Sequence, residues 1–171
     1  MAVIEAIQTT YLEVDVATVE FDISSSPGNT YEHLQLRMSV RTDRFDHDMV
    51  RINFNSDTGA NYSRHYMRGY ASSTQAGADT AQNYSRGGWI PGGDTDAADY
   101  GTTIVDILDY KDDGNKNTTL NWLVGAATDG NVYLVSGLWD NTDDVTSIVL
   151  VPHNGSNFVR GSEFTLYGIQ E

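Results

Sequence analysis

The residues that could carry catalytic chemistry are few and scattered. Four histidines are spread along the chain with no ligand-spaced pair among them: His33, His47, His65 and His153. Asp46-His47-Asp48 is the one place where charge clusters around a histidine. Successive residues of a strand point to opposite faces, so these three side chains can converge only in a tight loop. We expect no catalytic role there, because a general base must first lie within reach of its proton.

Carboxylates and nucleophiles give no clearer signal. With 24 acidic residues, chance pairs are unavoidable, and no pair stands in a context distinctive of glycosidase carboxylates. The chain contains neither a Gly-x-Ser-x-Gly elbow nor a Gly-x-x-x-x-Gly-Lys phosphate loop. The sequence therefore predicts a protein that is not an enzyme.

Calcium is the one ion that the Asp-rich segments of the chain could bind. Asp109 to Gly114 begins like a helical calcium loop, but Lys111 occupies a ligand position and Leu120 stands where a bidentate Glu is required. Two further groups fit either a calcium site in a non-helical loop or a solvated turn: Asp94, Asp96 and Asp99, and Asp140, Asp143 and Asp144. We expect no cofactor, and calcium in one of these loops is the alternative.

Tyrosine and arginine alternate in a way that indicates an interaction surface. On the expected strand 62–70, Tyr62, Arg64, Tyr66 and Arg68 share one face, and Tyr84 with Arg86 repeats the theme. Tyr and Arg are the side chains that anchor protein interfaces. The alternatives are a face that contacts a sister subunit or a capsid shell, and a half-exposed sheet with snorkelling arginines.

Two tryptophans have different expected roles. Trp89 lies in the Gly-rich segment 87–93 beside the acidic segment 94–99, and exposed there it is the candidate for stacking on a glycan. Trp139 ends an apolar segment, and we expect it to fill one end of the core.

The elements that must position these residues are β-strands. Short alternating segments recur between clusters of Gly, Asn, Asp and Ser, and helical periodicity is almost absent. We expect strands over 18–23, 33–41, 49–54, 62–70, 83–86, 102–110, 118–124, 131–139, 145–151 and 163–169. We expect a long exposed loop over 71–81, which lacks large apolar residues. This spacing predicts an all-β, single-domain, jelly-roll-like antiparallel β-sandwich with long acidic and Gly-rich loops.

Composition limits the partners and the construction of the core. The chain has 171 residues and a formal charge of −14. It contains no cysteine, which excludes disulfides and thiolate metal sites. So acidic a surface repels phosphate backbones and anionic lipid, which predicts no nucleic acid and no membrane as partners. The first residues have no basic region and no long apolar run, so we expect no secretory signal.

The N-terminal segment stands apart from the expected domain. Residues 1–17 carry apolar side chains ahead of a domain spanning 18–171. They are either the first strand or two of the sandwich or an arm that adds to a neighbour's sheet edge.

Several motifs resemble a jelly-roll domain of tailed-bacteriophage virion proteins. They are Tyr31-x-His33-Leu34-x-Leu36-Arg37, Ile52 to Tyr62, Ser136-Gly137-Leu138-Trp139, Val145 to Leu150, and Ser162-x-Phe164-x-Leu166-Tyr167-Gly168-Ile169. The last is the most specific, and the similarity runs from about residue 31 to the C-terminus. Members of this family are capsid decoration (cement) proteins, notably in cyanophages, and modules of tail or fibre proteins.

The resemblance implies a function and a location. It implies a virion structural protein on the outer surface of the capsid, which binds the major capsid protein and bridges capsomers as a homotrimer. The alternative is a tail or fibre module that binds a host-surface glycan. Neither role needs catalysis, so the resemblance supplies no catalytic residues.

Overall fold

The computed structural model describes residues 3–94, 96–111, 114, 116–126 and 130–170, where the regular elements are all strands. In chain order they are β1 (Val3–Tyr11), β2 (Val19–Asp22), β3 (His33–Val40), β4 (Val50–Phe54), β5 (Tyr62–Tyr70), β6 (Ser73–Gln82), β7 (Ser85–Arg86), β8 (Gly101–Leu108), β9 (Thr118–Ala126), β10 (Asn131–Trp139), β11 (Ser147–Pro152) and β12 (Glu163–Gln170). The predicted all-β class is confirmed. Among the described residues, no helix is long and apolar enough to cross a membrane.

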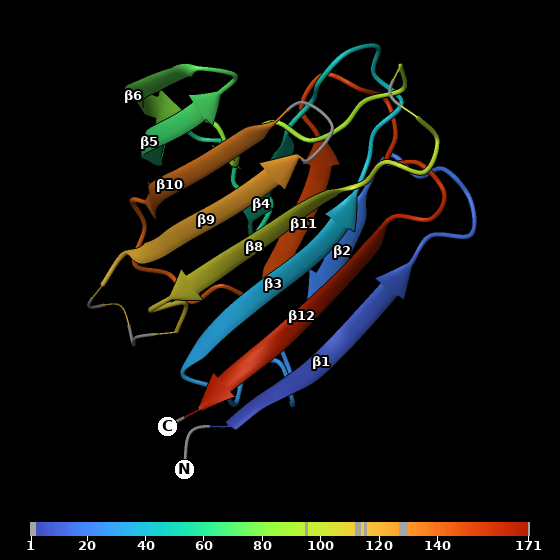
Figure 1. The fold of residues 1–171 in the computed structure, drawn as a ribbon. Helices are drawn as coiled ribbons and strands as arrows, with labels where there is room; N and C mark the ends of the chain where they lie inside the picture. Colours follow the sequence, from blue (N-terminus) through green and yellow to red (C-terminus); the bar gives the residue numbers. More distant parts are fainter. Residues whose placement is uncertain (1–2, 95, 112–113, 115, 127–129, 171) are drawn as a thin grey trace.

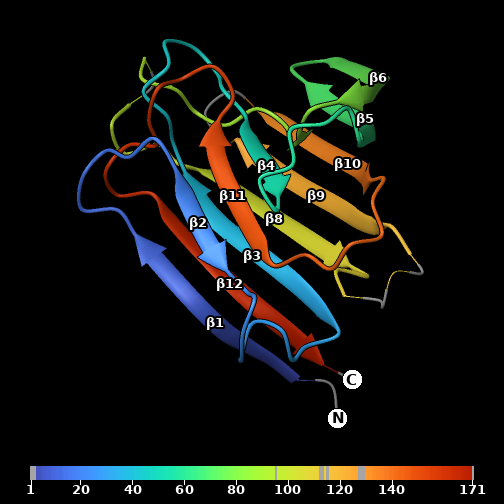
Figure 2. The same cartoon turned by 180° about the vertical axis from the view of Figure 1, so that it is seen from behind.

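The strands form two antiparallel sheets that pack face to face. The larger sheet has eight strands in the order β1-β12-β3-β8-β9-β10-β5-β6, and the smaller has four in the order β2-β11-β4-β7. Figure 1 views the larger sheet from its open side, and Figure 2 shows the smaller sheet lying across the other side. We call the side that meets the smaller sheet the inner face and the other side the outer face.

The core lies between the sheets and follows from the period-2 alternation of the strands. On β3, Leu34, Leu36 and Met38 are buried, whereas Arg37 and Ser39 are exposed. Ile52 of β4 and other apolar residues of the smaller sheet complete the same core. Trp139 is fully buried, as predicted, and its indole Nε1 donates a hydrogen bond to Asp57 Oδ2 at 2.7 Å.

The connections explain how distant segments reach one sheet. Three successive pairs are hairpin neighbours within the larger sheet: β5–β6, β8–β9 and β9–β10. Every other connection between described strands joins a strand of one sheet to a strand of the other. Each crossing therefore adds a strand to the opposite wall of the core.

The N-terminal segment contributes a strand to the molecule's own sheet. Residues 3–11 form β1, which pairs along β12 from Val3↔Gln170 to Tyr11↔Glu163. The register shifts between Ala6 and Gln8, so β1 carries a bulge. Of the two alternatives for residues 1–17, the described part takes the strand.

The prediction of a loop over 71–81 is wrong. Ser73–Gln82 form β6, which pairs with β5 over most of its length. This strand lies at the sheet edge and buries neither face, so it lacks the apolar alternation that marks a strand in sequence. Gly77 lies opposite Tyr66, whose ring covers it: a Cβ on Gly77 would lie 2.6 Å from the Tyr66 hydroxyl. An aromatic ring laid over a strand glycine in this way supports an otherwise weak strand.

Candidate functional site

The outer face of the larger sheet carries a row of apolar side chains in register across five strands. Ala76 of β6 pairs with Met67 of β5, Met67 with Leu134 of β10, Leu134 with Leu123 of β9, and Leu123 with Ile104 of β8. We call these five residues the apolar row. Met67, Leu134 and Leu123 are 65%, 58% and 50% exposed. Contiguous exposed apolar surface of this kind marks an interaction site.

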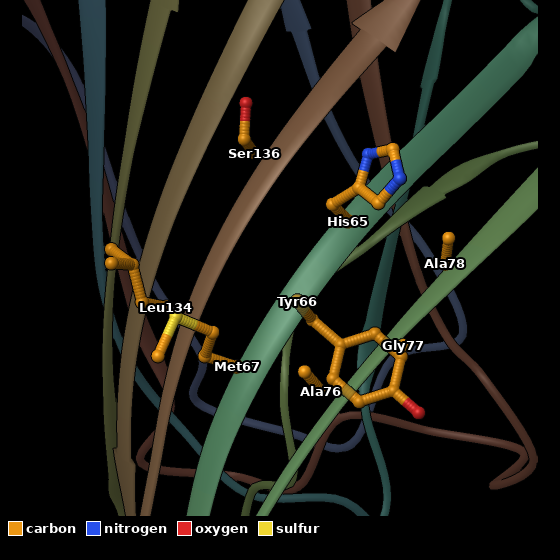
Figure 3. Close-up of a pocket in the computed structure, with 8 residues that line it drawn as sticks. All are labelled: His65, Tyr66, Met67, Ala76, Gly77, Ala78, Leu134 and Ser136. Atoms are coloured by element: carbon orange, nitrogen blue, oxygen red, sulfur yellow. The ribbon is translucent and has the colours of Figure 1, made fainter.

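A hollow of about 540 Å³ lies at the β6 end of the apolar row (Figure 3). Its floor comes from the short residues Ala76, Gly77 and Ala78 of β6, and Met67 and Leu134 form its apolar wall. The polar side chains at its rim are His65 and Ser136. The hollow exists because β6 presents no side chain larger than alanine here. Its lining is suited to an apolar side chain from a partner.

Charged groups on the outer face lie away from the apolar row's β6 end. Arg37 of β3 follows Ile104 in the same register and lies over the Tyr167 ring at 4.8 Å. Asp106 of β8 accepts a hydrogen bond from Gln35 Nε2 at 2.7 Å. The apolar row is therefore an uncharged strip on a protein whose formal charge is −14.

The Tyr–Arg face of β5, predicted as an interface, points to the interior. Tyr62 is fully buried and its hydroxyl accepts a hydrogen bond from the Phe54 amide at 3.0 Å. Burial raises the pKa of Tyr62. Arg64 is 8% exposed, and Tyr66 and Arg68 are half-buried. The predicted alternation is confirmed, since these four side chains share one face of β5. The assignment of Tyr62 and Arg64 to an interface is wrong, because this face is the inner one and lies against β7 at the edge of the smaller sheet.

Arg64 is neutralised and hydrogen-bonded where it lies. Its Nε donates to Asp79 Oδ2 at 2.7 Å, and its Nη1 donates to the carbonyls of Arg86 and Gly87 at 3.1 and 2.9 Å. Burial lowers the pKa of Arg64. Burial alone would raise the pKa of Asp79, but hydrogen bonds from Arg64 and Arg86 outweigh it and hold that pKa low. These bonds satisfy the charge that burial would otherwise penalise.

The remaining interface candidates extend the same network. Arg86 Nη2 lies 3.1 Å from Asp79 Oδ2, and its Nη1 lies 3.0 Å from His153 Nε2. Tyr84 is half-buried between the Arg51 guanidinium, 4.9 Å from its ring centre, and the edge of the His153 ring. Burial lowers the pKa of His153, and the charges of Arg86 and Arg51 lower it further. Tyr84 and Arg86 are thus part of the packing beneath β5 rather than a free surface.

Trp89 does not lie open in a loop as the glycan prediction requires. It is half-buried and packs against the core. The His47 ring stacks on it at 4.9 Å, and the Arg68 guanidinium lies 4.5 Å from its ring centre. Tyr70 and Tyr133 approach it at 5.8 and 6.1 Å. A sugar that stacks on tryptophan needs a free ring face, and these contacts take that place.

Asp46-His47-Asp48 lies in a loop, where His47 approaches Asp46 but Asp48 turns away. His47 Nε2 lies 3.5 Å from Asp46 Oδ1. Asp48 is buried and accepts hydrogen bonds from the amides of Asn154 and Gly155, both at 2.9 Å. Asp48 therefore holds the loop that follows β11, and its carboxylate is engaged away from the imidazole.

The acidic loops have local partners of their own. Asp94 Oδ1 accepts from the Asp46 amide at 2.9 Å, Asp96 Oδ1 from the Ala98 amide at 3.0 Å, and Asp140 Oδ1 from Asn117 Nδ2 at 2.7 Å. Within the described part of the chain, no three His, Asp or Glu side chains gather as metal ligands do. Asp112 and Asp113 of the segment resembling a calcium loop lie outside the described residues.

The apolar row was missed by sequence reasoning, although one signal pointed to it. The segment Val132-Tyr133-Leu134-Val135 of β10 is apolar on both faces. In an antiparallel sheet, continuous apolar character indicates that both faces are covered, whereas a solvated face alternates with polar residues. Tyr133 and Val135 are buried on the inner face of β10, whereas Val132 and Leu134 are exposed on its outer face.

Comparisons with protein-family models, curated proteins and solved structures return no match to this chain.

Proposed function

We propose that this protein is a virion structural protein with a jelly-roll fold, and that it decorates the outer surface of a phage capsid. The observation that supports the proposal is the apolar row, an uncharged strip of exposed side chains on a protein whose formal charge is −14. The repeated crossing between the two sheets is compatible with jelly-roll wiring. The motifs resembling virion proteins supply the biological setting.

The apolar row would contact the major capsid protein. Burying one exposed leucine or methionine contributes roughly 1.5–3 kcal/mol before the cost of association is subtracted. A few such side chains give a weak contact, and several copies on one particle make the attachment stable through multivalency. The acidic remainder of the surface faces solvent and keeps decorated particles from associating.

Binding to capsids that lack the protein tests this role. Leu134→Glu and Met67→Glu place a charge within the apolar row, and we expect each to reduce capsid binding at least tenfold in co-sedimentation. Phe45→Glu is the matched control, because Phe45 is exposed but lies on the loop before β4, away from the sheet. Equal loss of binding in the control would refute the assigned surface.

Immunogold labelling of purified virions tests the location itself. Label on the head supports a decoration protein. Label confined to the tail or fibres would favour the glycan-binding alternative and overturn the proposal.

A further inference from the structure

The strand β6 ends the larger sheet with an open hydrogen-bonding edge. It is last in the strand order, and β5 is its only neighbour among the described strands. Its ten residues make it one of the longest strands described. An edge strand presents unpaired amide and carbonyl groups, which another strand can bind.

Most of β6, from Ser73 to Asp79, lacks the features that block such pairing. It contains no lysine and no proline, and its one charged residue is Asp79. That carboxylate turns inward to Arg64 and Arg86, at 2.7 and 3.1 Å. β6 has a register shift of its own between Asp79 and Gln82, at its C-terminal end, whereas Ser73 to Asp79 pair without interruption. The opposite edge, β1, has its bulge in mid-strand, between Ala6 and Gln8, and carries Glu5. Bulges and charges are the devices by which proteins protect sheet edges, so the uninterrupted segment from Ser73 to Asp79 is the longer open template.

The register identifies which residues of β6 offer their backbone. Tyr70 and Ser73 pair around the two-residue loop 71–72. Such a closing pair exchanges both of its hydrogen bonds, and bonded pairs then alternate along the hairpin. The amides and carbonyls of Thr74, Ala76 and Ala78 therefore point to the open side.

Charge makes a second copy of the chain the fitting occupant. Two molecules of charge −14 repel wherever their acidic surfaces meet. Beside β6, the two positive charges of Arg64 and Arg86 outnumber the one negative charge of Asp79, with which both are paired. This group of side chains therefore adds no net negative charge to the edge. Antiparallel pairing of two β6 strands would also join the two apolar rows and bring the two hollows beside Ala76 and Ala78 together.

We propose that β6 pairs with β6 of a second copy about a two-fold axis, so that two larger sheets become one continuous sheet. A self-complementary patch of this kind closes at two copies. The inference is independent of capsid binding, because it concerns the free protein. The homotrimer implied by the resemblance is a different outcome, which mass distinguishes.

Disulfide trapping gives the sharpest test, because the chain contains no cysteine. Any disulfide formed by a single-cysteine variant must join two molecules. In a two-fold pair, only residues on or beside the axis approach their own copies closely, at Cβ distances that a disulfide accepts. The variants are Thr74→Cys, Ala76→Cys and Ala78→Cys, with Ala76→Cys/Ala78→Cys for an axis that passes through Gly77.

Ala6→Cys is the matched control. Ala6 is an exposed alanine on the outer face of the opposite edge strand, where it pairs with Tyr167. We expect covalent dimer under a mild glutathione buffer from at least one β6 variant, and at least tenfold less from Ala6→Cys. Equal trapping at both edges would overturn the proposal.

Solution mass tests the unaltered protein. We expect sedimentation velocity to show a dimer, and a monomer or a trimer at all concentrations would overturn the proposal. Ala78→Lys should shift the equilibrium toward monomer, whereas Ala6→Lys should leave it unchanged. Thermal melts of both variants establish that each is folded, so a change in mass reports on the edge alone.

Discussion

Strands β3 and β5 belong to the same sheet, but β3 buries its apolar residues whereas β5 buries its tyrosine and arginine residues. β3 buries leucines such as Leu36 and exposes Arg37. β5 buries Tyr62 and Arg64 and exposes Met67. Both strands alternate with the same period, so the difference comes from what lies across from them.

The covering layer accounts for this reversal. β3 lies over the apolar core between the two sheets. β5 faces the short strand β7 and the segment after it, where the carbonyls of Arg86 and Gly87 accept hydrogen bonds from Arg64. A guanidinium can be buried there because its charge is paired with Asp79 and its Nε and Nη1 donate hydrogen bonds. The apolar half of β5 is then left on the outer face.

The strongest test of this comparison replaces one arginine of each strand, Arg64 of β5 and Arg37 of β3, by leucine in separate variants. Arg64→Leu removes the donor to the carbonyls of Arg86 and Gly87 and one of the two cations beside Asp79. We expect the free energy of unfolding to fall by about 3 kcal/mol. Arg37→Leu, on the outer side of β3, should change it by less than about 0.5 kcal/mol. Urea denaturation measures both, and similar losses would contradict the reversal.

Removing the buried hydroxyl of β5 should give the next largest effect. Tyr62→Phe leaves the Phe54 amide without its acceptor. We expect a loss of about 1 kcal/mol in the free energy of unfolding. Tyr11→Phe on β1 is the control, since Tyr11 is exposed. An unchanged Tyr62→Phe protein would mean that water reaches this amide.

Acid should weaken the network beneath β5 through His153. Burial and the nearby Arg86 lower the folded-state pKa of this histidine, so the unfolded chain binds its proton more readily. Its contribution is fully present above the unfolded pKa of about 6.5 and is lost as pH falls through the folded pKa. The free energy of unfolding, measured against pH, should decline below about 6.5, and His153→Gln should flatten that decline. An identical slope in the variant would contradict this role.

Substitutions on the outer face of β10 should change the free energy of unfolding least. Leu134→Ser removes a side chain that is 58% exposed and has no covering layer in the single chain. We expect its free energy of unfolding to stay within about 0.5 kcal/mol of the unaltered protein. Val135→Ser, the inward neighbour, should be far more damaging because Val135 is buried. Equal losses would show that the outer face is already covered.

Sequence patterns located most strands because most bury one face. Segments such as 131–139 were placed with the observed bounds. β6 was missed because an edge strand with two open faces carries no apolar period. Trp89 was expected in the open because its neighbours are glycines, yet those glycines let Tyr133 pack closely over Gly88.

The amino-acid sequence by itself determined the strand class, the split of each strand into two faces, the absence of disulfides and the acidic charge. These follow from residue type and from the period of a strand. Only the tertiary structure decided which face is inside. That choice depends on whether the opposite layer offers apolar side chains or hydrogen-bonding groups, and those come from strands distant in the chain. It buried Arg64, exposed the apolar row and left β6 open at the edge of the sheet.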